Sequence, residues 1–339
     1  MRKAFLAALS VAILGLPSWA APGVTSYQAI DQSDYQHSGY FKVQQASKKA
    51  DGGDLKDAAE LYRKASEELP QSLMTYYSLG ETSYNLAEET TDPAERRKFL
   101  QEAKWAYHRV ANLHPDLTLG YYKLAEITWD LEAYDEAKAI IQEGLEYHPG
   151  DLLLNYSLGL TEEKLGNISA AKASYLDVIR IQPKYAPAYN SVALIYQEER
   201  NFTEAAKNLR KAIELKPDNP EFKLNLASVL SLDGNLDEAE GLAQQVLKID
   251  PDNALVYLTL GHISGEQKQY EKALLYYNKA AQLDPEYSAV YYYLSITLER
   301  LNRADEALAQ GMHYVNLSPD GPYAKQANEL ILTLKQKKD

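Results

Sequence analysis

The chain has 339 residues, with 48 acidic and 35 basic side chains, which gives a formal net charge of −13 at pH 7. This balance argues against nucleic acid and anionic lipid as ligands, because both need a basic surface. The sequence contains no cysteine, which excludes disulfides and a lipid-modified cysteine. A basic partner fits this charge, as does an acidic surface that serves only solubility.

The first twenty residues have the pattern of a secretory signal peptide. A basic start at residues 1–3 precedes an apolar run over residues 4–15, and the small residues Ser18 and Ala20 precede a cleavage point before Ala21. We therefore predict export, most directly to a bacterial periplasm, with the thylakoid lumen or the extracellular space as alternatives. An uncleaved anchor is the weaker interpretation, because the apolar run is short for a bilayer. No later segment is apolar enough to span a membrane, so we expect no insertion after cleavage.

Residues 21–38 form a polar arm ahead of a strictly periodic region. In that region a proline recurs every 34 residues, at Pro115, Pro149, Pro183, Pro217, Pro251, Pro285 and Pro319. A fixed period of this length predicts a solenoid of helix–turn–helix repeats. The register gives eight repeats: residues 39–72, 73–117, 118–151, 152–185, 186–219, 220–253, 254–287 and 288–321.

Two positions of each repeat hold small residues, which allow the two helices of a hairpin to approach closely. The eighth position holds Ala46, Gly80, Ala125, Gly159, Ala193, Ala227, Gly261 and Ser295. The twentieth, counted without an insertion in the second repeat, holds Ala58, Ala103, Ala137, Ala171, Ala205, Ala239, Ala273 and Ala307. In six repeats a large residue follows four positions later: Tyr62, Tyr107, Ile141, Tyr175, Leu209 and Tyr277.

The starts of the second helices also have local signals. Short polar residues two positions before the repeated alanine are predicted to cap these helices by accepting hydrogen bonds from their first amides. They are Asp135, Ser169, Thr203, Asp237 and Asp305. Gly53, Gly166 and Gly234 lie just ahead of such starts, where we expect them to form the turn between helices.

The second repeat contains an insertion, because Pro70 and Pro115 are eleven residues farther apart than the period requires. Within it, Asp92, Pro93 and Glu95 predict a helix start. Both helices of this hairpin should therefore be longer than their neighbours. A projecting hairpin would offer a docking site, and a neutral insertion at a tolerant turn is the alternative.

The last repeat is followed by a break in the pattern at residues 320–322, which read Asp-Gly-Pro. Apolar residues then recur at helical spacing, at Tyr323, Ala327, Leu330, Ile331 and Leu334. We predict an amphipathic capping helix in residues 322–339 that covers the open end of the stack.

These residues resemble the tetratricopeptide repeat, which combines a small residue in the first helix, alanine and an aromatic residue in the second, and a closing proline. The resemblance covers residues 39–321. It implies an all-α fold: a right-handed superhelix of eight helix–turn–helix repeats, here with a C-terminal capping helix. Proteins of this family mainly bind other proteins, so we expect no enzyme activity, no cofactor and no metal site.

The resemblance also implies where a partner would bind, because the first helices of such repeats line a concave groove. At these positions aromatic residues stand beside carboxylates, which suits a protein client with basic and apolar side chains. Packing between helices is the alternative role for the tyrosines. The expected groove residues are Tyr77, Glu81, Tyr84, Tyr122, Glu126, Trp129, Asp130, Tyr156, Leu160, Glu163, Asn190, Leu194, Tyr292 and Glu299.

Motifs for catalysis or metal binding are absent from the sequence. It has no Gly-rich phosphate loop, no His-Glu-x-x-His and no Gly-x-Ser-x-Gly. Asp233, Asn235 and Asp237 alternate like the start of a calcium loop, but Glu238 stands where that loop needs glycine.

Three functions are compatible with these observations. We favour a non-catalytic assembly scaffold of the bacterial envelope that holds client proteins. The first alternative is an accessory role in polysaccharide secretion or cell-wall synthesis, in which tyrosines and Trp129 stack on sugar rings. The second is delivery of a divalent cation to a client through the acidic surface. The sequence indicates no oligomeric state.

Overall fold

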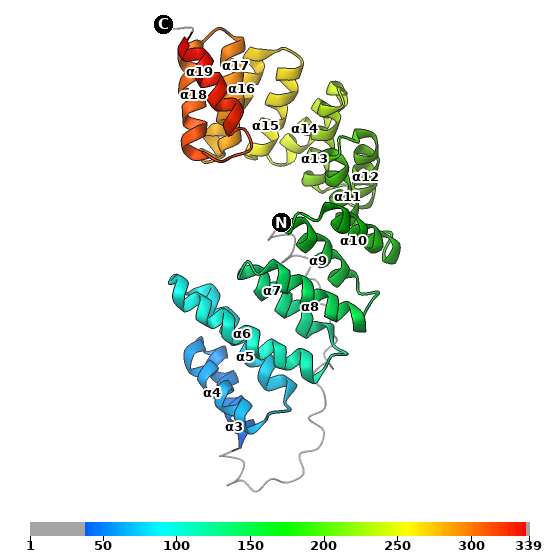
Figure 1. The fold of residues 1–339 in the computed structure, drawn as a ribbon, viewed down its shortest axis with the longest axis vertical. Helices are drawn as coiled ribbons and strands as arrows, with labels where there is room; N and C mark the ends of the chain where they lie inside the picture. Colours follow the sequence, from blue (N-terminus) through cyan, green and yellow to red (C-terminus); the bar gives the residue numbers. More distant parts are fainter. Residues whose placement is uncertain (1–37, 337–339) are drawn as a thin grey trace. The chain divides into compact units, whose positions relative to one another are not determined.

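The computed structural model describes residues 38–336, and within them it contains seventeen α-helices and no β-strand (Figure 1). The all-α prediction is therefore confirmed. The predicted signal peptide (residues 1–20) and nearly all of the predicted arm (residues 21–38) lie outside the described residues. None of the described helices is both long enough and apolar enough to cross a bilayer.

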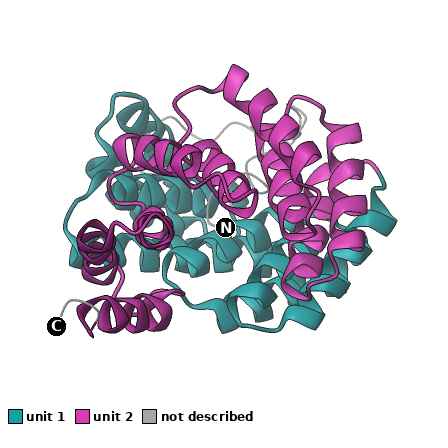
Figure 2. Cartoon of the chain, turned by 90° about the horizontal axis from the view of Figure 1, so that it is seen from above, with its two compact units in different colours: residues 1–183 teal, residues 184–339 magenta. Residues whose placement is uncertain are grey.

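The chain divides into two compact units, residues 1–183 and 184–339, which Figure 2 shows in different colours. The described helices of the first unit are α3 (Gly39–Asp51), α4 (Leu55–Glu68), α5 (Leu73–Glu89), α6 (Pro93–Leu113), α7 (Thr118–Asp130), α8 (Tyr134–Tyr147), α9 (Leu152–Lys164) and α10 (Ile168–Ile181). Those of the second unit are α11 (Ala186–Glu198), α12 (Phe202–Leu215), α13 (Pro220–Leu232), α14 (Leu236–Ile249), α15 (Ala254–Glu266), α16 (Tyr270–Leu283), α17 (Ser288–Arg300), α18 (Ala304–Leu317) and α19 (Ala324–Gln336).

Within both units the helices pack as hairpins, with the odd-numbered helices α3 to α17 as first helices and α4 to α18 as second helices. Most of them contain 13 or 14 residues. The exceptions are α5 with 17 residues and α6 with 21, which form the hairpin of the predicted insertion. Asp92 caps α6 as expected, because its Oδ1 accepts a hydrogen bond from the Ala94 amide at 2.9 Å.

A left-handed residue ends the first helix of seven repeats, always at the fifteenth position. Glycine fills it at Gly53, Gly166 and Gly234, with φ between 76° and 86°. Other residues adopt φ of 58° to 60° there, namely Glu132, Arg200, Lys268 and Asn302. The next amide then returns to a carbonyl five residues back, as in Asn167 to Glu162 at 2.8 Å. This Schellman-type turn satisfies carbonyls at the end of the first helix.

The predicted caps of the second helices are wrong, because these helices begin earlier than expected. The closing turn fixes the helix start at the seventeenth position, so the predicted caps lie inside the first turn instead. They are Asp135, Ser169, Thr203, Asp237 and Asp305. In α12 the capping side chain is Asn201, which accepts from the Glu204 amide at 3.3 Å. The three aspartates still place negative charge at helix N-termini, where the helix dipole favours it.

Tyrosine and glycine are matched in size across three hairpins. A Cβ on Gly80, Gly159 or Gly261 would lie within 3 Å of the ring of Tyr107, Tyr175 or Tyr277, respectively. Where the eighth position is alanine, the facing residue is smaller in three repeats: Ile141, Leu209 and Ala243. The first repeat departs from this rule, since Ala46 faces Tyr62. The size match sets the distance between the helices of each hairpin.

The last helix, α19, packs against α18 and buries Ala327, Ile331 and Leu334. The chain just before it is fixed by Tyr323, whose ring stacks on Tyr292 with centroids 4.4 Å apart and planes 3° from parallel. The Tyr323 amide also donates to the Tyr314 hydroxyl at 2.9 Å. These contacts attach α19 to the end of the last hairpin.

Candidate protein-binding face

The predicted groove residues lie on the first helices of the repeats. In the first unit, we call the surface formed by α5, α7 and α9 the first-helix face. Side chains of neighbouring first helices meet here, as Glu81 of α5 does with Lys123 of α7 and Trp129 of α7 with Thr161 of α9. Their side chains lie across one another, so the geometry of each residue depends on the next repeat.

The centre of this face is Lys123 of α7, whose side chain is only 8% exposed. Its Nζ lies 2.7 Å from Oε1 of Glu81 in α5 and 3.5 Å from Oε2 of Glu126, one turn along α7. The ammonium group also lies over the rings of Tyr84 and Tyr107, at 5.9 and 6.0 Å from their centroids. The sequence did not indicate Lys123, because it stands between Tyr122 and Leu124 and its partner Glu81 belongs to the preceding repeat.

Burial and charge act in opposite directions on the pKa values of this group. Burial lowers the pKa of Lys123, but Glu126 and Glu81 outweigh this, so the net shift is upward. Burial raises the pKa of the Glu126 carboxyl, and Lys123 only partly offsets that effect. Lys123 therefore stays charged, while Glu126 takes up a proton more readily than an exposed glutamate.

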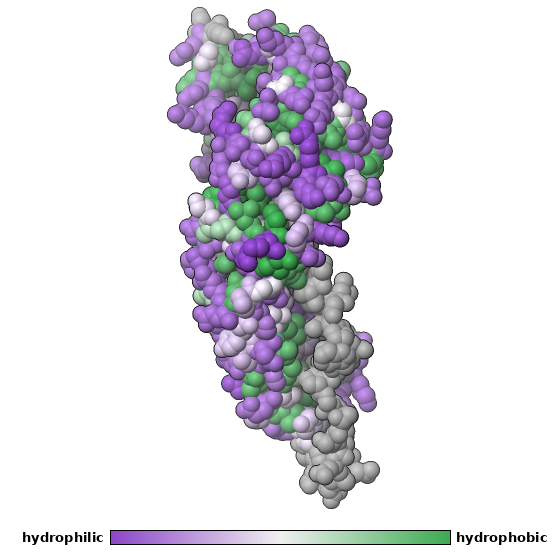
Figure 3. Space-filling view, turned by 90° about the vertical axis from the view of Figure 1, so that its right-hand side faces the viewer, coloured by the Kyte–Doolittle hydropathy of each residue, from purple (hydrophilic) through white to green (hydrophobic). Residues whose placement is uncertain are grey.

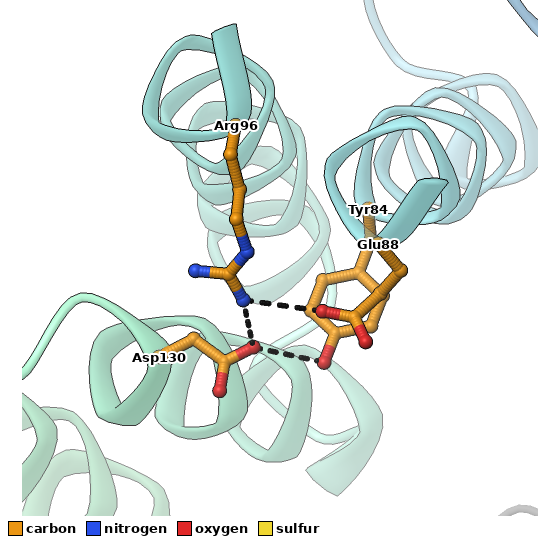
Figure 4. Close-up of polar contacts among 4 residues, drawn as sticks. All are labelled: Tyr84, Glu88, Arg96 and Asp130. Carbon is orange, nitrogen blue, oxygen red and sulfur yellow. Dashed lines mark hydrogen bonds and ion pairs between the residues drawn. The ribbon is translucent and has the colours of Figure 1, made fainter. Parts of the chain in front are cut away.

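The insertion contributes a second polar group to the same face (Figure 4). The Tyr84 hydroxyl donates to Oδ2 of Asp130 at 3.0 Å, and Nη2 of Arg96 lies 3.5 Å from the same oxygen. Arg96 also pairs with Glu88 at 3.1 Å. Since Arg96 belongs to α6 and Asp130 to α7, the longer hairpin is bonded to the next repeat. On its other side, Lys56 of α4 reaches Glu95 at 3.2 Å.

Tyr77 and Tyr107 complete the group around Glu81. Their rings meet edge to face with centroids 5.9 Å apart, and the Tyr107 hydroxyl donates to Glu81. Burial, followed by the charge of Glu81, raises the pKa of both tyrosines. Both hydroxyls therefore remain protonated donors at neutral pH.

Several of the expected groove residues are buried, which agrees with the packing role that the sequence left open for the tyrosines. Their side chains lie between neighbouring first helices, where they are at most 8% exposed: Tyr122, Trp129, Tyr156, Leu160 and Asn190. Trp129 Nε1 donates to Thr161 at 3.0 Å, and the Tyr122 hydroxyl donates to Asp151. The ring of Trp129 is thus enclosed by the protein and has no open face for a sugar.

The remaining predicted residues are less deeply buried, although the side chain of Asp130 is fully covered. In the first unit these are Tyr77, Glu81, Tyr84, Glu126, Asp130 and Glu163. The Glu81 side chain keeps 35% of its surface exposed, whereas that of Glu126 keeps 13% and that of Asp130 none. Glu163 accepts from the Tyr175 hydroxyl at 3.0 Å. Of the two carboxylates that pair with Lys123, Glu81 is therefore the more accessible.

The second unit holds the other predicted residues in different surroundings. Asn190 accepts from the Asn225 side chain at 2.8 Å, and Tyr292 is stacked on Tyr323. Leu194 and Glu299 are half-buried. These four residues therefore do not share one polar network like that around Lys123.

The central group of the first-helix face carries excess negative charge. Four carboxylates, from Glu81, Glu88, Glu126 and Asp130, surround two cations, Lys123 and Arg96. Hydroxyls of Tyr84 and Tyr107 add polarity at its edge. Such a surface attracts basic side chains and offers aromatic area to an apolar neighbour.

The described residues show no group of side chains that points to metal binding. No group of three or more histidine, aspartate or glutamate side chains within residues 38–336 is placed to hold a metal ion. His262 Nδ1 lies 3.2 Å from Ser231 Oγ, but that hydroxyl is buried. A hollow of about 410 Å³ in the second unit is lined by Arg303 and Glu306, which bind each other at 2.6 Å.

Family models of the tetratricopeptide repeat match four stretches of the chain: residues 120–151, 153–185, 196–263 and 254–287. No curated protein matches the sequence. The comparison with solved structures instead finds matches at low sequence identity.

Many solved structures share the fold, among them the following three. A tetratricopeptide repeat protein from Parabacteroides merdae is 16% identical, with a TM-score of 0.63 over 76% of this chain and 98% of that one. The Cut9–Hcn1 hetero-tetramer of the APC/C contains a chain that is 15% identical, with a TM-score of 0.60 over 83% of this chain and 52% of that one. Pseudomonas aeruginosa pilF is 18% identical, with a TM-score of 0.51 over 62% and 95%. At these identities the likeness shows the fold alone.

Proposed function

Because this chain is a tetratricopeptide repeat protein, we propose that it is a non-catalytic scaffold that binds protein segments on its first-helix face. The fold supports protein–protein interaction in general. The observation that carries the finer proposal is the group around Lys123, where four carboxylates outnumber two cations beside half-buried tyrosines.

The client segment on this proposal carries basic and apolar side chains. An arginine or lysine of the client would pair with Glu81, the more accessible of the two carboxylates beside Lys123. Charge-assisted hydrogen bonds of this kind are roughly twice as strong as neutral ones. Tyr77 and Tyr84 would contribute rigid aromatic area beside it.

We place this scaffold in the bacterial envelope, on the basis of residues 1–20. If the full chain is produced in a Gram-negative host, the protein recovered from the periplasmic fraction should begin at Ala21 by intact-mass measurement. Recovery of the unprocessed chain from the cytoplasm would contradict the proposed location in the envelope. It would not bear on the proposed binding face.

Client capture is tested by using the purified chain as bait in an envelope extract of its native host. Replacing Glu81 with glutamine should reduce the amount of each captured protein. Glu214→Gln is the matched control, because the Glu214 side chain is 66% exposed and lies on a second helix. Equal capture by the parent chain and both variants would remove the first-helix face from the proposal.

The two alternatives gain no support from the described residues. The polysaccharide role depended partly on Trp129, whose ring is enclosed. The cation role requires a group of ligands, and none is assembled within residues 38–336.

A further inference from the structure

The outward side of α6 combines positive charge with an exposed tryptophan. This helix carries five basic and two acidic residues, although the whole chain has a net charge of −13. Its buried side is formed by Leu100, Ala103, Ala106, Tyr107, Val110 and Ala111. On the opposite side, residues Ala94, Arg97, Lys98, Gln101, Trp105 and Asn112 are exposed. Polar side chains predominate on the face that Figure 3 shows, with smaller hydrophobic areas between them.

Trp105 is the centre of this outward side, with 47% of its surface exposed. Its ring meets the buried Tyr76 edge to face, with centroids 5.6 Å apart. The repeat architecture does not need a large residue there. The same register position in the other repeats holds Glu60, Ala139, Ala173, Lys207, Gly241, Leu275 and Ala309.

Arg109 is held next to Trp105, one helical turn along α6. Its guanidinium lies over the Tyr76 ring at 5.2 Å and donates to the Pro70 carbonyl at 3.3 Å. A guanidinium has five N–H donors, so most of them remain for a ligand. Tyr76 therefore supports both an indole and a guanidinium in fixed positions.

Arg97 and Lys98 extend the positive charge toward the start of α6. Both are exposed, and neither has an ion-pair partner among the described residues. The other charged residues of the helix are engaged, since Glu102 pairs with Arg63 and Lys104 pairs with Glu136. From Lys98 to Arg109 the helix spans about 16 Å, enough for a short peptide segment.

We propose that this surface, the Trp105 patch (Arg97, Lys98, Trp105 and Arg109), docks an acidic segment of a partner protein that also carries an apolar side chain. Charge complementarity identifies the occupant, because three cations without an ion-pair partner among the described residues share the outward side of α6 with an exposed tryptophan. Tryptophan and arginine are the residues that most often dominate binding energy at interfaces. The patch lies on a second helix and has the opposite charge to the first-helix face, so one chain would hold two chemically different partners.

Nucleic acid and anionic membranes fit the Trp105 patch less well. Both ligands extend well beyond a site of three cations and would meet the acidic surface of the remaining chain. A protein segment contacts only the patch itself. Charge therefore favours a peptide over a polyanion or a bilayer.

Selection of random twelve-residue peptides displayed on phage, with the full chain immobilised, tests this proposal. The recovered peptides should combine aspartate or glutamate with an aromatic residue or leucine. In a titration with a synthetic copy of such a peptide, Trp105→Ala should weaken binding by about thirtyfold. The double variant Arg97→Glu, Lys98→Glu should weaken it by about tenfold and reduce its dependence on salt.

Two controls separate the Trp105 patch from general effects. Leu275→Ala removes the other large apolar side chain at this register position, 71% exposed, and should leave the affinity unchanged. Glu81→Gln should also leave it unchanged, so failure of this proposal and of the first-helix face can be told apart. Circular dichroism checks that each variant keeps its helices.

Four results would overturn the inference: recovery of no peptide that needs Trp105, recovery of basic peptides only, Trp105-dependent binding to vesicles of phosphatidylglycerol, or Trp105-dependent dimerisation of the chain.

Discussion

Lys123 reaches from α7 to Glu81 in α5, with 2.7 Å between Nζ and Oε1, and so links the first helices of two neighbouring repeats. In a solenoid each repeat is stabilised mainly by the interface with its neighbours. This one ion pair therefore contributes both to the stability of the stack and to the charge of the proposed binding face.

Replacing Lys123 with methionine should destabilise the chain by about 1–3 kcal/mol. The change leaves the carboxylates of Glu81 and Glu126 close together without a cation. The expected loss of stability is smaller than for a fully buried ion pair, because Glu81 is partly exposed. Urea unfolding followed by circular dichroism measures the difference. The control is Lys211→Met, whose lysine pairs with Glu214 on the surface and should leave stability nearly unchanged. Equal effects of the two variants would contradict this role for Lys123.

The pKa of Glu126 predicts a pH-dependent effect. Burial raises this pKa above 4.5, so the folded chain holds the proton more tightly than the unfolded chain. The resulting stabilisation is present at low pH and is lost as the pH rises through the folded pKa. Glu126→Gln mimics the protonated carboxyl. The free energy of unfolding of this variant minus that of the parent chain should therefore be larger at pH 7 than at pH 4.

Glu60 provides the control of opposite sign for this experiment. Hydrogen bonding to Lys64 lowers the pKa of Glu60, so its stabilising effect is present at neutral pH and is lost as the pH falls. Glu60→Gln should accordingly lose stability relative to the parent chain at pH 7 but not at low pH. If both variants shifted in the same direction, the account of Glu126 would be wrong.

The match between glycine and tyrosine predicts that Gly159→Ala destabilises the fourth repeat. The new Cβ would overlap the ring of Tyr175, and overpacking of this kind costs about 1–3 kcal/mol. Gly241→Ala is the control, since no atom lies within 4 Å of a Cβ there and the site is an exposed helix position. This control should gain about 0.5–1 kcal/mol. A loss of stability in both variants, measured by urea unfolding, would refute the size match.

The left-handed turn residues predict a stabilising substitution. Lys268 has φ of 60°, in the same turn in which Gly166 and Gly234 stand in other repeats. Lys268→Gly should raise stability by about 0.5–1 kcal/mol, because glycine adopts this conformation without a Cβ clash. Gly166→Ala should lower it by about 1 kcal/mol. A thermal unfolding midpoint that falls with Lys268→Gly would count against strain at this turn.

The sequence predicts the helical fold better than it predicts the face. Proline spacing and small residues such as Ala137 and Gly159 report contacts inside one hairpin, so they predict paired helices, and the all-α repeat fold is confirmed. Whether Tyr122 and Trp129 are exposed depends on the distance between neighbouring first helices. The residue pattern within one repeat does not determine that distance, so their burial could not be predicted. The ion pair between Lys123 and Glu81 also joins two repeats, so the pattern of a single repeat could not predict it. Whether the predicted groove residues bind a client stays a prediction.

The second-helix starts illustrate a different limit. Asp237 has the residue type of a cap, but the position of a helix start follows from the turn before it. That turn ends at Gly234 with a left-handed residue, and α14 begins at Leu236. Residue type alone therefore placed the start two residues too late.

The most direct test of the first-helix face is a titration of the full chain with two fluorescein-labelled peptides, followed by fluorescence anisotropy. The peptides share leucines at alternate positions and carry either arginine or glutamate between them. We predict that the arginine peptide binds and that Glu81→Gln weakens it by about three- to tenfold, whereas Glu214→Gln, which removes the same charge from a second helix, does not. Equal weakening by the two variants, or binding of the glutamate peptide that depends on Glu81, would contradict the proposed face.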